Sequence, residues 1–191
     1  MIQKTPSATP AARATTVATA APTSRLALAA RETALIGLGT VALALIGQIS
    51  LPLPFTPVPV TLGSLAALGV GAVLGSRRGI ASSLLLAALA AVGAPVLAGW
   101  SSGVTASFGY VLGYALAAGL AGRVARSGAS LPVRFALMLL ASSSVFVPGV
   151  IWLKIALGVG WSKAVALGLT PFLIGDVLKT AFMTVVTTKR R

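Results

Sequence analysis

The sequence predicts an all-α integral membrane protein with six transmembrane helices, and three observations lead to this fold class. Of the 191 residues, 57% are apolar and 9% are charged, against roughly 25% charged residues in ordinary soluble domains. Apolar stretches recur at about the 17–25 residues that a helix needs to cross a bilayer. Short groups of basic residues separate these stretches, as they do in membrane proteins. We therefore expect a multi-pass protein of the plasma membrane whose outer surface is covered by lipid.

The predicted spans follow one another from residue 30 almost to the end of the chain. They cover residues 30–49, 60–76, 79–97, 107–125, 132–153 and 165–187. Pro148-Gly149 interrupts the fifth span and is expected to kink or divide it, because proline removes a helical hydrogen bond. Residues 1–24 are rich in Thr, Ala, Pro and Ser and are interpreted as a disordered cytoplasmic tail. Residues 25–191 then form one transmembrane substrate-binding domain.

The basic residues are distributed unevenly between the two sides that these spans define. Twelve of the 15 Lys and Arg residues fall on the side that holds both chain termini. The opposite side has Lys154 and Lys163 in its last loop, and Lys179 lies within the last span. Because cytoplasmic loops carry the excess of Lys and Arg, this distribution predicts that both termini are cytoplasmic.

Two further patterns concern the packing of the spans and their first connection. The segment 51–59 contains four prolines, which favour an extended path and either cap a cavity or form a plain connector. Small residues recur at every fourth position in the second and fourth spans, which lets helix backbones approach closely. We expect most of these rows to serve packing within the bundle, and one or two to be able to dock a partner, as at Ala30 and Ala34.

Asp176 and Lys179 are the leading candidates for a functional site. They lie three residues apart in the last span, on one face of a helix and within reach of each other. Ionisable groups in hydrocarbon are costly and by default mark substrate paths. We therefore expect them to line a polar pocket in the outer part of the helix, open to the outside. The alternative is an internal ion pair that only neutralises itself.

The segment 98–110 is expected on the same outer side. It combines aromatic rings, hydroxyl groups and glycine, as small-molecule sites do. Its candidates for substrate binding are Trp100, Ser101 and Tyr110, and Gln48 at the outer end of the first span is a further one. Trp100, Tyr110 and Gln48 have an alternative role as interfacial residues. The serines at 142–144 are expected to bond the backbone or to pack.

The composition also argues against several functional classes. The chain has no histidine and no cysteine, so we expect no catalytic residues, no metal site and no cofactor. The basic residues form no patch with interleaved aromatics, so nucleic acid is not an expected partner. There is no G-x-x-x-x-G-K-[ST] phosphate loop. The protein therefore works passively, or another subunit hydrolyses nucleotide.

Six segments form an ordered set along the chain: 48–53, 56–62, 74–79, 93–99, 109–113 and 171–179. Together they resemble the BioY family of biotin transporters, the substrate-capture (S) components of energy-coupling-factor (ECF) transporters. The first two segments are similar to the opening of the family, and the other four follow in the family's order. The resemblance implies a six-helix bundle with both termini inside, and biotin bound near the outer surface. It also implies a transmembrane coupling subunit and two ATP-binding subunits as partners.

Carried over residue by residue, the resemblance matches Asp176 and Lys179 to the family's polar pair in the last helix. Tyr110 matches the aromatic of its G-G-Y segment, and Ser101 falls near a polar loop residue. The chain departs from the family at Gly63, where a glutamine is usual, and at 103–108, which is shorter. The alternatives are an S component for another vitamin, a biotin transporter that acts without the coupling module, an intramembrane enzyme and a structural scaffold.

Overall fold

The computed structural model describes residue 1 and residues 25–188, and eight α-helices form nearly all of the regular structure in this part of the chain. Apart from residue 1, the predicted tail at 1–24 lies outside the described residues. The helices are α1 (Arg25–Gly47), α2 (Gly63–Leu74), α3 (Ser76–Ala91), α4 (Phe108–Val124), α5 (Leu131–Ser143), α6 (Phe146–Leu157), α7 (Trp161–Gly168) and α8 (Leu173–Thr188). Two short 3₁₀ turns, η1 (Ala98–Trp100) and η2 (Thr170–Phe172), precede α4 and α8.

These helices make up the six predicted spans. The first four spans are α1 to α4, the fifth is α5 followed by α6, and the sixth is α7, η2 and α8. Within the described residues, three stretches are long and apolar enough to cross a membrane, namely Arg25–Gly47, Leu131–Leu157 and Trp161–Thr188. Two shorter helices, Gly63–Leu74 and Phe108–Val124, are also apolar.

The fifth span is divided, as predicted, and the division lies just before Pro148. The break falls between α5, which ends at Ser143, and α6, which begins at Phe146. Pro148 lies in the first turn of α6, where its missing N–H costs nothing because the first N–H groups of a helix have no partner within the helix. The sixth span, expected to be continuous over 165–187, is also interrupted. Leu169 leaves helical geometry there with φ −123° and ψ −56°.

The segment between α1 and α2 is not helical either. It forms an antiparallel pair of two-residue strands, β1 (Ser50–Leu51) and β2 (Val60–Thr61), in which Ser50 faces Thr61. The four prolines predicted to follow an extended path lie between these strands. The hairpin therefore fixes both ends of the proline segment at the end of the bundle where α1 stops and α2 starts.

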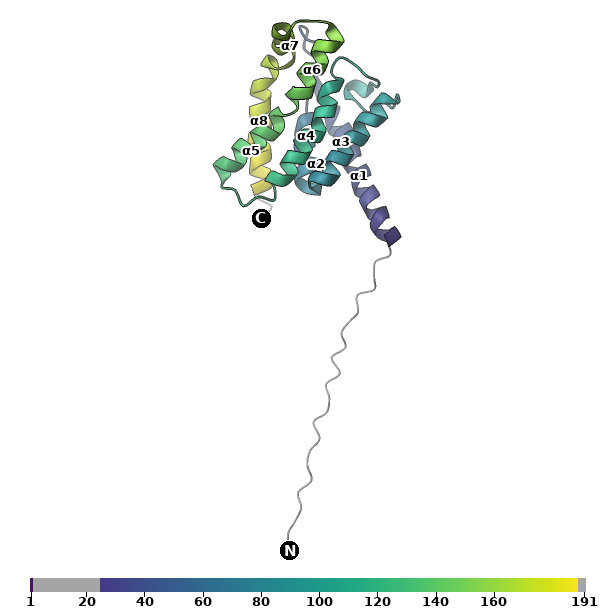
Figure 1. Cartoon of the computed structure of the whole chain (residues 1–191), viewed down its shortest axis with the longest axis vertical. Coiled ribbons are helices and arrows are strands. Elements are labelled where there is room, and N and C mark those ends of the chain that lie inside the picture. Colours follow the sequence, from purple (N-terminus) through teal and green to yellow (C-terminus); the bar gives the residue numbers. More distant parts are fainter. Residues whose placement is uncertain (2–24, 189–191) are drawn as a thin grey trace.

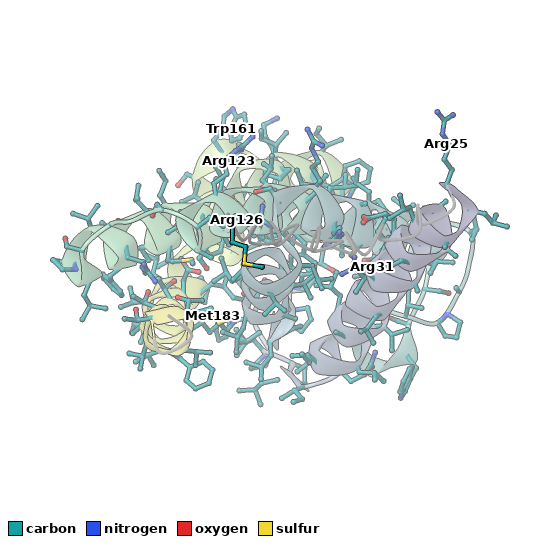
Figure 2. The ribbon with its side chains drawn as sticks, turned by 90° about the horizontal axis from the view of Figure 1, so that it is seen from below. Arg25, Arg31, Arg123, Arg126, Trp161 and Met183 are labelled. Atoms are coloured by element: carbon teal, nitrogen blue, oxygen red, sulfur yellow. The ribbon has the colours of Figure 1, made fainter. Side chains whose placement is uncertain are left out.

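The helices gather around α4, which packs against α2, α3, α5 and α6 (Figure 1). The described start of α1 and the end of α8 lie at one end of the bundle, and α7 lies at the other (Figure 1). Figure 2 looks at the bundle from the end where the described part of α1 starts and α8 ends. Arg25 and Arg31 come from α1, Arg123 from the last turn of α4, and Arg126 from the connection that follows it. The described start of α1 and the end of α8 thus share one side with these arginines, while the cytoplasmic orientation stays a prediction.

The rows of small residues serve packing inside the bundle, as expected. A Cβ atom on Gly71 of α2 would overlap the backbone carbonyl of Ala118 in α4. On Gly113 of α4 it would lie 2.8 Å from the Cα atom of Val145, at the start of α6. These helices are close enough that a methyl group does not fit between them, which is the role of small residues in membrane bundles.

We predict that Gly71→Ala lowers the stability of the protein, because the added methyl group must push α2 away from α4. Overpacking of this kind costs roughly 1–3 kcal/mol. The matched control is Gly37→Ala in α1, where a Cβ atom meets nothing within 4 Å and alanine improves helix propensity by up to about 1 kcal/mol. Thermal unfolding of the purified protein in detergent measures the difference. Equal melting temperatures for the two variants would contradict this account of the packing.

Candidate functional site

A cavity of about 410 Å³ opens at the end of the bundle that carries the hairpin. Its size is within the roughly 300–1,000 Å³ of small-molecule sites. The proline segment contributes Pro57, Val58 and Pro59 to the wall, and the α3–α4 connection contributes Leu97 and Ser101. The rest of the wall comes largely from the helices, with most of these residues on α4, α1 and α8. The proline segment is therefore part of a cavity wall and more than a plain connector.

Asp176 lines this cavity from the first turn of α8, and its side chain is only 5% exposed. Ser142 and Ser143, at the end of α5, each donate a hydroxyl hydrogen bond to it. Ser142 Oγ bonds Oδ1, and Ser143 Oγ bonds Oδ2 at 2.8 Å. The expectation that these two serines only bond the backbone or pack was wrong, because α5 packs against α8 and brings both hydroxyl groups to the carboxylate. Ser144 does bond the backbone, at the Ala141 carbonyl.

Lys179 lines the same cavity one turn further along α8. Its Nζ atom donates to the Thr61 carbonyl of β2 at 2.6 Å and contacts the Ser64 hydroxyl of α2 at 3.4 Å. In the described residues, 1 and 25–188, Arg78 and Glu32 form the one salt bridge with an N–O distance within 4.0 Å. Asp176 and Lys179 do not form a salt bridge with each other. The geometry therefore differs from the internal ion pair considered above, because each charge has its own partners.

Three aromatic rings form one part of the cavity lining, which we call the aromatic wall: Tyr110 of α4, Phe146 of α6 and Phe172 of η2. Each pair of ring centroids is 6.4 Å apart. The Tyr110 hydroxyl donates to the Gly168 carbonyl at 2.7 Å and thereby ties α4 to the end of α7. Aromatic pairs at this distance are mutually favourable and present a rigid apolar surface.

Sequence reasoning identified Tyr110 but missed Phe146 and Phe172. Both phenylalanines read as ordinary apolar residues of a membrane span. Phe146 follows the break at 144–145, and Phe172 lies within the interruption at 169–172. The signal available in the sequence was the Pro171-Phe172 step, since a proline marks a change of backbone path.

The other predicted candidates lie at the cavity or beside it. Ser101 is in the lining, and its hydroxyl donates to the Ala98 carbonyl at 2.8 Å. Gln48 and Trp100 are not among the lining residues. Trp100 is 59% exposed and has a positive φ of 55°. Direct contact of Gln48 and Trp100 with a ligand stays a prediction.

Gln48 connects the end of α1 to the α3–α4 connection. Its Nε2 atom donates to the carbonyls of Ala44 and Leu97, both at 3.0 Å, and its Oε1 atom accepts from the backbone N–H of Trp100 at 3.1 Å. A second link comes from Thr56, whose hydroxyl donates to the Leu167 carbonyl of α7 at 2.9 Å. These contacts hold the segments around the cavity in place.

The side chains that line the cavity are suited to binding a ligand. Its charged groups are a hydrogen-bond acceptor, Asp176, and a donor, Lys179, beside the aromatic wall and several hydroxyl groups. No group of three or more His, Cys, Asp or Glu side chains that could hold a metal ion occurs in the part of the chain that the structure describes. A polar and partly apolar small molecule fits these features.

Comparisons with known proteins agree on one family. The sequence model of the BioY family matches residues 15–191. A probable biotin transporter BioY from Pyrococcus horikoshii is 35% identical over 158 residues, which are 82% of this chain and 94% of the relative. Biotin transporter BioY2 from Lactococcus lactis subsp. cremoris is 32% identical and covers 79% of this chain and 85% of its own. Biotin transporter BioY from Rhizobium etli is 36% identical, with 77% and 84% covered.

A solved structure shares the fold. It is the crystal structure of the S-component for biotin from an ECF-type ABC transporter. The TM-score is 0.73 at 24% sequence identity, and the match covers 86% of this chain and 92% of that one. The likeness confirms the predicted S-component-like bundle.

We predict that Gln48→Ala loosens the α3–α4 connection. The variant removes two hydrogen bonds that cross from α1 to this connection, and their loss lowers the cost of opening it by roughly 1–3 kcal/mol in total. Because the chain has no native cysteine, a nitroxide on Ser102→Cys reports the mobility of this segment by electron paramagnetic resonance. The same label on Ser130→Cys, in the α4–α5 connection, is the control and should not change. An unaltered spectrum at residue 102 would show that Gln48 does not hold the loop.

Proposed function

The chain belongs to the BioY family, and we propose that it is the membrane-embedded substrate-binding subunit of a biotin uptake system. It captures biotin from the outer side of the membrane and passes it inward with an ATP-driven energy-coupling module. The observation that carries the proposal is the cavity in which Asp176 and Lys179 are bonded by separate partners and both face the enclosed space. The curated relatives described above are named as biotin transporters.

The chemistry of biotin suits this cavity. Its ureido ring offers N–H donors and a carbonyl acceptor, its thioether ring is apolar, and its tail ends in a carboxylate. An ionised Asp176 can only accept hydrogen bonds, so it pairs with the ureido N–H groups, which are the donors that biotin carries. Lys179 donates to a biotin oxygen. Such charge-assisted bonds are strong when they are shielded from water.

The aromatic wall suits the bicyclic ring of the ligand. Rigid aromatic side chains bury a large apolar area and lose little rotamer freedom. Ser101, which lies in the lining, supplies a further hydroxyl group. Gln48 and Trp100 act on the ligand chiefly by holding the α3–α4 connection over the cavity.

The membrane context follows from the same features. The chain is a multi-pass membrane protein and a transport protein rather than an enzyme. With both termini in the cytoplasm, the cavity at the opposite end opens to the outside. Because the sequence has no phosphate loop, the energy comes from other chains, which we propose to be a transmembrane coupling subunit and two ATP-binding subunits. The alternatives are transport of biotin without this module and capture of another vitamin.

Binding of radiolabelled biotin by the purified protein tests the proposal, with other vitamins as competitors. We predict that Asp176→Asn and Lys179→Ala each weaken biotin binding by about ten- to a hundredfold, as expected when a charge-assisted hydrogen bond of roughly 1.5–3 kcal/mol is lost.

The chain offers matched controls for both charges. Glu32, its other acidic residue, bonds Arg78 away from the cavity, and Lys163 is exposed on α7. Glu32→Gln and Lys163→Ala should leave the dissociation constant unchanged. Wild-type protein that binds another vitamin in preference to biotin would favour that alternative, and full affinity in both cavity variants would remove Asp176 and Lys179 from the site.

We also predict that Phe172→Ala weakens biotin binding by roughly tenfold, because it removes one ring of the aromatic wall, and an aromatic contact is worth about 0.5–1.5 kcal/mol beyond its buried area. Phe182→Ala is the matched control, since Phe182 lies on the same span and is 60% exposed on the outside of the bundle. Isothermal titration of both variants with biotin measures the effect. Equal affinity in the two variants would rule out ring contact by Phe172.

A further inference from the structure

Two adjacent hydroxyl groups bracket the buried carboxylate of Asp176. Ser142 donates to one carboxylate oxygen and Ser143 to the other. Consecutive residues of a helix point about 100° apart, so the two serines approach the carboxylate from different directions. Ser142 is 1% exposed and lines the cavity beside Asp176, whereas Ser143 is not among the lining residues.

Several other serine hydroxyls of the bundle donate to backbone carbonyls, some of them on a neighbouring helix, as Ser76 does to Gly119 and Ser82 to Ile36. Serine and threonine in membrane helices usually donate to a carbonyl of the preceding turn. Ser83 does so at Gly79, Ser144 at Ala141 and Thr184 at Thr180. The hydroxyl groups of Ser142 and Ser143 donate instead to the carboxylate of Asp176 on α8. Both hydroxyl groups are therefore committed to Asp176.

The two hydrogen bonds satisfy the buried carboxylate directly, since no cationic side chain forms a salt bridge with it in the described residues. An ionised carboxylate in hydrocarbon is costly unless it is paired or hydrogen-bonded. Within the described residues, Asp176 has no salt-bridge partner. A carboxylate has about four lone-pair positions, and the two serines occupy one position on each oxygen. The remaining positions are left for a donor in the cavity.

From this geometry we infer that Ser142 and Ser143 are positioning residues that determine the specificity of the site. They hold Asp176 as a charged acceptor with fixed orientation, so that this part of the cavity accepts a ligand N–H group and rejects a ligand carboxylate or a ring nitrogen that lacks hydrogen. The inference rests on the proposed function, because it assigns the ureido N–H groups of biotin to Asp176. It adds two residues that act through Asp176 without providing the charge themselves.

The experiment is a double-mutant cycle on biotin affinity in detergent-solubilised protein. Its members are the wild type, the pair Ser142→Ala with Ser143→Ala, Asp176→Asn, and all three changes together. We expect the serine pair to weaken binding by about tenfold or more, as for lost hydrogen bonds to a charged group. In the Asp176→Asn background, the same serine changes should alter affinity by less than about twofold, because residues that act as one unit are not additive.

Two further variants separate positioning from simple packing. Ser144→Ala is the matched control from the same segment, and it should bind biotin like the wild type because the Ser144 hydroxyl donates to the Ala141 carbonyl and not to Asp176. Ser143→Thr keeps the hydroxyl group and should bind biotin more tightly than Ser143→Ala. Equal affinity of the Thr and Ala variants would overturn the positioning role.

A modified ligand gives a measurement that would not change if the two serines had only a structural role. Biotin methylated on the ureido nitrogens cannot donate to Asp176. The wild type should prefer biotin over this analogue, and the serine pair should lose about tenfold of that preference. An unchanged preference, or additive effects in the cycle, would overturn the inference.

The outcomes also separate this inference from the proposed function. Failure of the wild type to bind biotin would overturn both. Biotin binding by the wild type that is lost in Asp176→Asn and kept in the serine pair would overturn the inference alone. Where the serine pair does not fold, the comparison is made with Ser143→Ala, whose melting temperature and affinity are measured together.

Discussion

The structure depends on keeping two opposite charges on one helix apart. Asp176 and Lys179 are three residues apart on α8, yet each is bonded by other elements. The end of α5 supplies hydroxyl groups to the carboxylate, and β2 and α2 supply oxygen atoms to the ammonium group. Had the two charges paired directly, each would have been satisfied without any ligand. Their separation makes the cavity a place where a polar molecule is recognised.

The helix breaks serve this separation. A continuous fifth span would carry Ser142, Ser143 and Phe146 on one regular helix. The break at 144–145 lets the serines meet Asp176 while Phe146 turns toward Tyr110 and Phe172. The interruption at 169–172 places Phe172 in the same wall. The close contact of α4 with α6 at Gly113 supports this arrangement.

The parts of the fold that follow from composition and periodicity could be predicted. Apolar length and charge were enough to predict the number and order of the spans and the side on which the basic residues lie. The rarity of acidic residues and the local sequence pattern were enough to propose Asp176, Lys179 and Tyr110 as site residues. The rest depends on contacts between segments far apart in the chain. No local pattern indicates that Ser142 bonds Asp176, 34 residues away, or that Gln48 holds Trp100, 52 residues away. Phe146 and Phe172 are apolar like their neighbours, and only tertiary packing distinguishes them.

The hydrogen bond from Lys179 to the Thr61 carbonyl has a consequence for how the cavity responds to its contents. The same ammonium group that meets the enclosed space also anchors the strand at one end of the proline segment. A molecule that engages this ammonium group therefore acts on the backbone beside the opening as well as on the last helix. By thermodynamic reciprocity, a displacement of that strand changes the affinity for the ligand, and the coupling free energy is the same in both directions. Ligand binding at Lys179 and the position of this strand are therefore thermodynamically linked.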